Sequence, residues 1–280
     1  MDNRNLLVGL YNEDNTYRFG WGHSVRMRAL GSALELLGVK VQYKPSRHVD
    51  LPDIAVLDYC SKDRFDWEAV PRGSKTVFLV AAGHEIIGDV VAAHDLVVYQ
   101  GPDCLVPQSL IQRYRSKILR GFENVILRPE FARPPTTTKR SGVAVYFGNG
   151  VPVPFELAVF TDLNDRCGRN VYRVAGTGGA VVDILDQVTA FVGTMGMVAY
   201  EAIARGLRPY LYSVDQDHHS TVAALASLGL AIDLGFVDTK HVPEFPLVPL
   251  RGGLLPDSSP IDGGGATRVA KRILETRDEW

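Results

Sequence analysis

The stretch Phe19-Gly-Trp-Gly-His-Ser-Val-Arg-Met-Arg-Ala-Leu-Gly-Ser-Ala-Leu-Glu-Leu-Leu-Gly38 decides how the first part of the chain is expected to fold. It follows an apolar run, residues 6–10, that is typical of a buried strand. Its apolar residues then recur at helical spacing as far as Gly38, a residue that commonly ends helices. The order of strand, glycine loop and helix indicates the first unit of a doubly wound α/β domain.

The glycine loop before this helix is suited to a ligand. Gly20 and Gly22 have no Cβ atom, so a ligand can approach the backbone closely. The free N–H groups of a helix start favour an anion. His23, next to the basic Arg26, could therefore be a general base for a phosphate-bearing substrate. The alternative is that His23 only caps the helix and Arg26 lies on a solvated face. The glycine spacing is neither a Rossmann fingerprint nor a P-loop.

Strands alternate with helical stretches along the rest of the chain. Further strands are expected at residues 39–43, 53–58, 75–81, 96–99, 142–147, 170–175, 190–192 and 209–213. Further helices are expected at residues 155–163, 181–187, 197–205, 221–228 and 266–276. This alternation predicts parallel sheets with helices packed on them.

A segment rich in proline and threonine separates two such series and predicts two domains. We expect an N-terminal domain over 1–130, a linker over 131–140, a C-terminal domain over 141–262, and a helical segment over 263–280 that could pack back on the N-terminal domain.

The composition predicts a soluble, cytoplasmic protein. The 280 residues are 46% hydrophobic and 22% charged, as in ordinary folded proteins. The net charge of −2 gives no indication of a nucleic-acid or membrane-surface partner. The three cysteines, Cys60, Cys104 and Cys167, form no CxxC pattern or disulfide framework, which is typical of a reducing compartment. No signal peptide is recognisable, and no apolar run has the length of a membrane span.

Asp58 closes the apolar run 53–58, and Tyr59 follows it directly. Ligands of open α/β sheets bind at the carboxyl ends of strands, so Asp58 is in a position to contact one. The pattern fits equally well with a carboxylate that caps the next turn.

A second small-residue loop, Gly193-Thr-Met-Gly196, also follows a strand and opens a helix, so its N–H groups can bind a diphosphate. Glu201, an acid among apolar residues of that helix, could bind ribose hydroxyls or could belong to a surface or capping network. Gln216 follows the next strand and could bind a sugar or nucleotide. His218 and His219 lack the i, i+4 spacing of a zinc motif and a third ligand, so no metal site is expected. Two anion-binding loops, one in each half, suggest a ligand held across a cleft.

Five motifs occur in order along most of the chain. They are Gly20-Trp-Gly-His-Ser-Val-Arg26, Val56-Leu-Asp-Tyr59 followed by Asp66-Trp-Glu68, Leu127-Arg-Pro-Glu-Phe131, Phe147-Gly-Asn-Gly150, and the block from Gly193 to Pro209 with Gln216. Together they resemble the motifs of the PseG/SpsG family of nucleotide-sugar hydrolases, which are relatives of MurG-like GT-B glycosyltransferases. The sequence departs from the family at Asn149, where the family has the second residue of a Gly-Gly pair.

The resemblance implies a GT-B fold, that is, two Rossmann-like, doubly wound parallel-sheet domains facing a cleft, with UDP bound mainly by the C-terminal half. It implies that His23 is the base that activates water for attack on the anomeric carbon of a UDP-linked amino or deoxy sugar, as in nonulosonic-acid biosynthesis of the pseudaminic or legionaminic type. Asp58 would orient the sugar or the histidine.

The expected catalytic residues are thus His23 and Asp58. The expected substrate-binding residues are Gly20, Gly22, Arg26, Tyr59, Gly148, Gly193, Thr194, Met195, Gly196, Glu201 and Gln216. UDP would be part of the substrate or product, and neither a separate cofactor nor a metal is expected.

Two other functions fit the same motifs. A GT-B glycosyltransferase would use the same base to deprotonate an acceptor hydroxyl. A nucleotide-sugar-binding protein without activity would use only the binding residues. The UDP-sugar is the expected partner in all three cases, without nucleic acid and without membrane insertion.

Overall fold

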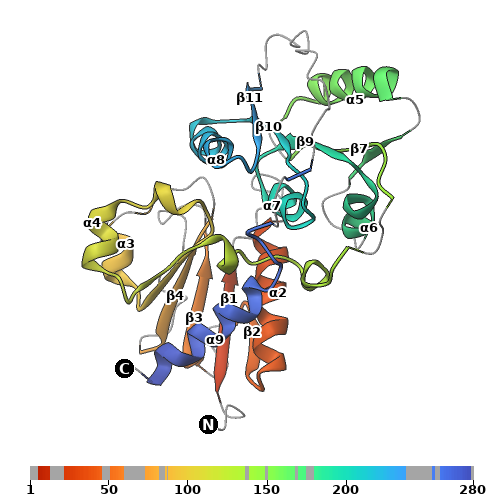
Figure 1. Ribbon diagram of the computed structural model, residues 1–280. Coiled ribbons are helices and arrows are strands. Elements are labelled where there is room, and N and C mark those ends of the chain that lie inside the picture. The colour runs from red at the N-terminus through yellow and green to blue at the C-terminus, as the bar shows by residue number, and fades with distance from the viewer. Residues whose placement is uncertain are drawn as a thin grey trace. The chain divides into compact units, whose positions relative to one another are not determined.

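The computed structural model describes residues 6–12, 22–45, 51–59, 73–81, 86, 88–135, 139–148, 151–167, 170–174, 180–237, 254–255 and 259–278. The chain divides into two compact units. One comprises Met1–Pro129 together with Gly263–Trp280, and the other comprises Glu130–Asp262. Each unit is built on one parallel sheet (Figure 1).

Among the described residues, the first unit has a six-stranded sheet in the order β2-β1-β3-β4-β5-β6. The strands are β1 (Leu7–Asn12), β2 (Lys40–Tyr43), β3 (Ile54–Asp58), β4 (Lys75–Val80), β5 (Leu96–Tyr99) and β6 (Ile118–Leu119). The helices are α2 (Gly22–Leu36), α3 (Gly88–Ala93), α4 (Gln108–Arg113) and α9 (Gly265–Asp278), with short 3-10 turns η3 (Asp103–Leu105) and η4 (Phe122–Asn124).

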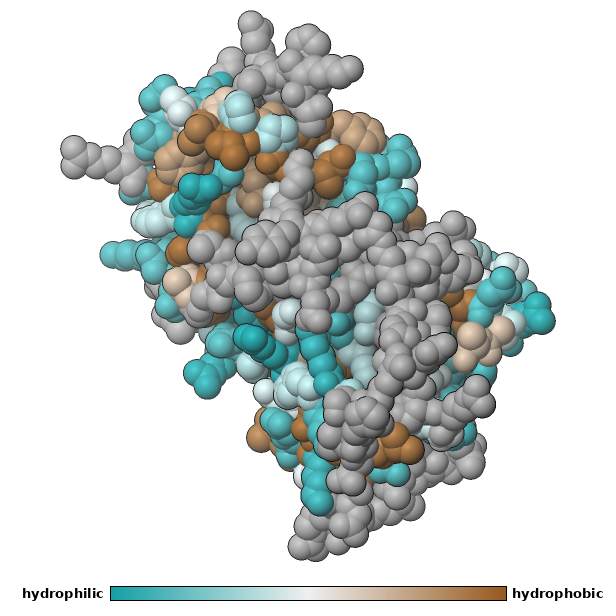
Figure 2. Space-filling view, turned by 180° about the vertical axis from the view of Figure 1, so that it is seen from behind, coloured by the Kyte–Doolittle hydropathy of each residue, from teal (hydrophilic) through white to brown (hydrophobic). Residues whose placement is uncertain are grey.

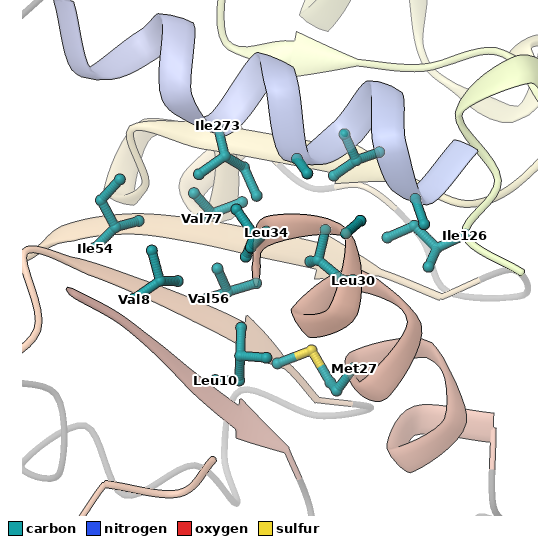
Figure 3. Close-up of a cluster of buried hydrophobic side chains, with 14 of the residues drawn as sticks. Val8, Leu10, Met27, Leu30, Leu34, Ile54, Val56, Val77, Ile126 and Ile273 are labelled. Atoms are coloured by element: carbon teal, nitrogen blue, oxygen red, sulfur yellow. The ribbon is translucent and has the colours of Figure 1, made fainter. Parts of the chain in front are cut away.

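Helices cover both faces of the first sheet. Successive strand residues point to opposite faces, so Val56 and Leu57 of β3 belong to different hydrophobic clusters. Val56 packs in the cluster with Leu34 of α2 and Ile273 of α9 (Figure 3). Leu57 belongs to the opposite cluster, which includes Val91 of α3. Burying each such aliphatic side chain contributes about 1.5–3 kcal/mol.

The described part of the second unit has a five-stranded sheet in the order β11-β10-β9-β7-β8. The strands are β7 (Val143–Tyr146), β8 (Val171–Arg173), β9 (Ala190–Thr194), β10 (Tyr210–Ser213) and β11 (Ile232–Phe236). The helices are α5 (Val153–Cys167), α6 (Ala180–Gln187), α7 (Met197–Ala204) and α8 (Gln216–Ser227), and the 3-10 turn η5 (Pro129–Ala132) lies at the boundary between the units.

Both sheets follow the same strand pattern. In the first, β1 has the next strand, β2, on one side and β3 on the other. In the second, β7 has β8 on one side and β9 on the other. Such a reversal is the topological switch point at which open α/β sheets bind ligands. The predicted fold class, two doubly wound parallel sheets, is therefore confirmed, and each sheet offers one switch point.

Arg205, at the end of α7, anchors the start of the expected linker within the second unit. Its guanidinium donates hydrogen bonds to the carbonyl oxygens of Glu130, at 2.9 Å, and of Arg133. It lies 4.9 Å from the ring centroid of Phe131, which is buried, and its Nε is 3.1 Å from a carboxylate oxygen of Asp186. This part of the segment is packed rather than extended through solvent.

Several elements differ from the sequence expectations. Helix α8 begins at Gln216 rather than at residue 221, because the Asp215 carboxylate caps it by accepting the backbone N–H of His218 at 2.8 Å. Strands β6 and β11 and helices α3 and α4 were not expected. They are short or only weakly periodic in sequence. The two strands are stabilised by pairing with β5 and β10, and the two helices by packing on the first sheet.

The surface of the described residues carries scattered hydrophobic side chains. On the face shown in Figure 2, hydrophobic and hydrophilic residues are interspersed. The exposed large hydrophobic residues come from several elements, for example Leu36 of α2, Leu157 of α5 and Phe236 of β11. Within the described ranges, no helix combines the length and the apolar character needed to cross a membrane.

Candidate active site

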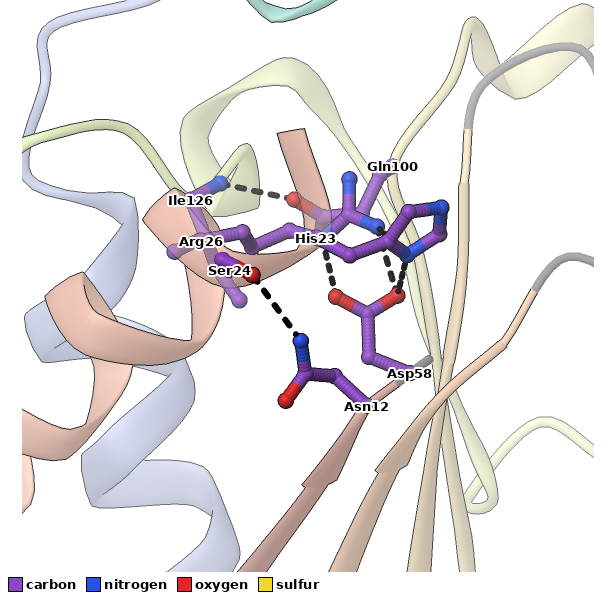
Figure 4. Close-up of polar contacts among 7 residues, drawn as sticks. All are labelled: Asn12, His23, Ser24, Arg26, Asp58, Gln100 and Ile126. Carbon is purple, nitrogen blue, oxygen red and sulfur yellow. Dashed lines mark hydrogen bonds and ion pairs between the residues drawn. The ribbon is translucent and has the colours of Figure 1, made fainter. Parts of the chain in front are cut away.

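Three side chains meet at the carboxyl end of β3. Nδ1 of His23 lies 2.7 Å from Oδ1 of Asp58. Nε and Nη2 of Arg26 donate to Oδ2 and Oδ1 of the same carboxylate, at 2.9 and 2.6 Å (Figure 4). The exposed fractions of His23, Arg26 and Asp58 are 7, 8 and 0%. The three residues form one buried ionic cluster.

Local structure brings these side chains together. His23 and Arg26 are three residues apart in the first turns of α2, so they lie on one face of the helix. Asp58 is the last residue of β3 and pairs in register with Asn12, the last residue of β1. The Asn12 side-chain amide donates to the Ser24 hydroxyl at 3.1 Å, which ties the start of α2 to the end of β1. The cluster therefore lies at the β1/β3 switch point.

Asp58 is ionised. Burial alone would raise its pKa, but the charges and hydrogen bonds of Arg26 and His23 outweigh burial and lower the pKa to about 2. A carboxylate only accepts hydrogen bonds, so Nδ1 of His23 is the donor in its contact with Asp58. In the neutral imidazole, Nε2 then carries the lone pair. Figure 4 shows this second ring nitrogen directed away from Asp58.

The contact of Arg26 with the histidine has a different character. Nη2 of Arg26 lies 3.1 Å from Nδ1 of His23. Both atoms are donors in the tautomer set by Asp58, so this contact is a close approach around a shared carboxylate and not a hydrogen bond. A neutral histidine that is oriented by a buried carboxylate and carries its lone pair at Nε2 can act as a general base.

The other residues expected around this cluster are placed as follows. Gly22 is the first residue of α2. Tyr59 follows β3 directly and is partly buried against the hydrophobic cluster on the α3 face of the sheet. Gly20 lies outside the described residues. The sequence pattern assigned Arg26 to the substrate, whereas the guanidinium here binds Asp58.

The second unit brings its expected loop residues together at the β7/β9 switch point. Gly148 lies just after β7, and Thr194 is the last residue of β9. The backbone N–H of Gly148 donates to the Thr194 hydroxyl at 3.0 Å. Met195 is buried, and Gly196 precedes the first residue of α7 with an extended backbone. Backbone groups at the start of α7 thus lie beside the ends of two adjacent strands.

Gly193 is required by close packing of the strands. It pairs with Tyr146 of β7, and a Cβ atom at this position would overlap the Tyr146 carbonyl oxygen. At Gly196, in contrast, a Cβ atom would meet no heavy atom of the described structure within 4 Å. The two glycines of this loop therefore differ. Close strand packing explains why residue 193 is a glycine, whereas Gly196 has open space beside it at the start of α7.

Glu201 and Gln216 lie in contrasting environments. Glu201 is in α7 with an exposed fraction of 0%, so a ligand can reach its carboxylate only if covering atoms move. Gln216 is exposed at the start of α8, beyond the carboxyl end of β10.

Nδ1 of His218 is 2.6 Å from Oδ1 of Asp215, the residue that caps α8. In the described part of the chain, no group of three or more histidine, cysteine, aspartate or glutamate side chains could hold a metal ion.

Two polar contacts near the first cluster were not found from sequence. One is the Asn12–Ser24 hydrogen bond, and the other involves Gln100, which follows β5. The buried Gln100 side chain donates to the Asn124 carbonyl at 3.2 Å and accepts the Ile126 N–H at 2.7 Å. The available signal was positional, because both Asn12 and Gln100 are polar residues at the ends of apolar strands.

No protein-family model matches the chain, and no curated protein sequence matches it. Several solved structures, however, are similar to it. The structure of LpCGTa in complex with UDP has a TM-score of 0.62 at 12% identity, and the match covers 98% of this chain and 99% of that one.

The glycotransferase of kitacinnamycin has a TM-score of 0.61 at 14% identity, over 96% of this chain and 98% of that one. MurG of Acinetobacter baumannii has a TM-score of 0.58 at 9% identity, over 96% of this chain and 99% of that one. At these identities the likeness shows the fold alone, which is that of GT-B glycosyltransferases.

Proposed function

We propose that the protein is a glycosyltransferase that uses a nucleotide-sugar donor, with UDP as the favoured nucleotide. The observation that carries this proposal is the buried His23–Asp58 pair at the β1/β3 switch point, with Nε2 of the histidine directed away from its carboxylate partner. The fold supports it, because LpCGTa, in complex with UDP, and MurG have the same architecture.

The proposed reaction needs one proton transfer and one substitution. Nε2 of His23 accepts the proton of an acceptor hydroxyl while the hydroxyl oxygen forms a bond to the anomeric carbon of the donor sugar. The bond between that carbon and the diphosphate oxygen breaks, and its electron pair leaves with UDP. Asp58 stabilises the imidazolium that forms and holds the ring in place.

Donor binding is assigned to the second unit. The loop from Gly193 to Gly196 and the start of α7 supply backbone N–H groups and the positive end of a helix dipole for the diphosphate. Gly148 lies at the adjacent strand end. Glu201 would bind the ribose after a local rearrangement, and Gln216 would bind the sugar.

Hydrolysis of the nucleotide sugar is the second candidate. Its specific support is the ordered set of five motifs that resemble the PseG/SpsG hydrolases, including the segment that contains His23. The same base would then take a proton from water, and the products would be UDP and free sugar. The two candidates differ only in the oxygen that attacks the anomeric carbon.

The experiment that separates these functions measures UDP release from a panel of UDP- and TDP-linked amino and deoxy sugars. Each donor is tested alone and with a panel of acceptors that carry free hydroxyls, while NMR follows the sugar. Release that depends on an acceptor, with formation of a new glycoside, is the expected result. Release without acceptor, matched by free sugar, would establish hydrolysis instead. UDP binding without release under any condition would identify a binding protein.

A further inference from the structure

Arg26 has the geometry of a residue that acts on Asp58 and not on a ligand. Its guanidinium uses both Nε and Nη2 on the two carboxylate oxygens, and its side chain is 10% exposed. Paired N–H donors on two carboxylate oxygens fix the plane of the carboxylate as well as its position. A guanidinium engaged in this way has little surface left for a diphosphate.

We propose that Arg26 is a positioning residue for His23: by its two bonds to Asp58 it keeps that carboxylate ionised and aimed at Nδ1, and so keeps the lone pair at Nε2. This inference rests on the proposed function only in naming His23 as the base. It reassigns Arg26 from the expected substrate contacts to the support of the catalytic histidine.

The charges around Asp58 explain why Arg26 is needed. Among the described residues, the charged groups that shift the pKa of this carboxylate are Arg26 and His23, both from α2. The residues paired with it in the sheet, Asn12 of β1 and Leu79 of β4, are uncharged. Asp58 has an exposed fraction of 0%, so bulk water does not solvate its charge in the folded protein. Without Arg26, burial would favour the protonated carboxyl, which can donate a proton to Nδ1 and reverse the tautomer.

The two possible roles of Arg26 lead to different kinetics. If Arg26 positions His23, Arg26→Gln lowers kcat by about 10²-fold, near the lower end of what general base catalysis contributes, with little change in the donor KM. The loss of rate on the acid side also moves to higher pH, because removal of this positive charge, 3.1 Å from Nδ1 of His23, makes both Asp58 and His23 easier to protonate. If Arg26 instead binds the diphosphate, the donor KM rises and kcat is largely retained.

The deciding experiment is ¹⁵N NMR of histidine-labelled protein, which reports the imidazole tautomer without any turnover. The wild type is compared with Arg26→Gln and Arg26→Lys, and the His23 signals are assigned with His23→Gln. Arg28→Gln is the matched control. Arg28 lies on the same helix and is exposed, so this substitution removes the same charge away from Asp58. The Arg26→Gln/Asp58→Asn variant removes both charges and avoids leaving one buried alone.

We expect the wild type and Arg28→Gln to show His23 with its proton at Nδ1 at neutral pH. Arg26→Gln and the double variant should lose this preference. Arg26→Lys should retain it in part, since an ammonium keeps the positive charge but lacks the paired N–H donors of the guanidinium. An unchanged His23 tautomer in Arg26→Gln would overturn the inference, whatever the double variant shows, because the double variant also lacks the Asp58 carboxylate that orients Nδ1. Because the readout needs no substrate, the inference can fail while the proposed function stands, and the reverse also holds.

Discussion

The backbone N–H of Gly148 donates to the hydroxyl of Thr194 across 3.0 Å and joins the carboxyl ends of β7 and β9. At the equivalent point of the first sheet, an ionic cluster containing His23 and Asp58 lies at the ends of β1 and β3. The two switch points thus carry different chemistry on the same topology. One offers backbone groups suited to an anion, and the other offers an acceptor for a proton.

Substitution of the loop glycines should separate packing from ligand binding. Gly193→Ala forces a Cβ atom onto the Tyr146 carbonyl, and we expect a loss of about 1–3 kcal/mol in the free energy of unfolding. Gly196→Ala meets no neighbour and should change stability by no more than about 0.5 kcal/mol. Denaturant unfolding measures both. Equal stability of the two variants would contradict the strand packing described for Gly193.

The Asp58 cluster should make stability depend on acid pH. The folded pKa of Asp58, about 2, is below its ordinary value of 3.8, so its contribution is complete above that value and is lost as the pH falls toward 2. The contribution is on the order of 2 kcal/mol. In Asp58→Asn this dependence disappears, so the stability difference from the wild type should shrink between about pH 5 and 2. A difference that stays constant over this range would contradict an ionised, paired Asp58.

His94 should give a second, separate pH dependence. It is buried, and its ring stacks on Phe78 with centroids 5.0 Å apart. Burial lowers its pKa from 6.5 to about 4. The neutral ring is therefore favoured in the folded state, and stability should fall by on the order of 3 kcal/mol as the pH drops from about 6.5 to 4. His94→Gln should remove this dependence in urea titrations at a series of pH values. An unchanged pH slope would show that His94 titrates alike in the folded and unfolded states.

The Arg205–Asp186 pair should be coupled in the stability of the second unit. Both side chains are 2% exposed, so removal of either one leaves a buried charge without its partner. We expect Arg205→Met and Asp186→Leu each to cost about 3–5 kcal/mol, and the double variant to cost clearly less than their sum. Arg205→Met also loses the hydrogen bonds to Glu130 and Arg133. Additive costs in a double-mutant cycle would show that the two side chains act independently.

The sequence predicted the elements that have strong local signals. Apolar runs closed by a polar residue located β3 and β5, and helical periodicity ended by Gly38 located α2, where a φ of +83° at Gly38 suits glycine. Elements stabilised by contacts remote in sequence were missed, such as the two-residue strand β6. Its identity as a strand depends on pairing with β5.

The candidate site was predicted by residue type more than by contact. His23 and Asp58 follow from their places after β1 and β3, because parallel strands bring their carboxyl ends to one edge. The sequence could not show whether the Arg26 side chain binds a ligand, faces solvent or binds Asp58. Its contact with Asp58 joins residues 32 positions apart, and spacing within one helix cannot reveal such a contact. The complete burial of Glu201 likewise results from tertiary packing around α7.

The most direct test of the central claim compares UDP release by the wild type and by His23→Gln, with UDP binding measured on both proteins by calorimetry. We expect the wild type to release UDP from a sugar donor in the presence of an acceptor. We expect His23→Gln to lose activity by about 10²–10⁴-fold, the contribution of a general base, while its UDP affinity stays within about threefold. Full activity in His23→Gln would contradict the assignment of His23 as the base.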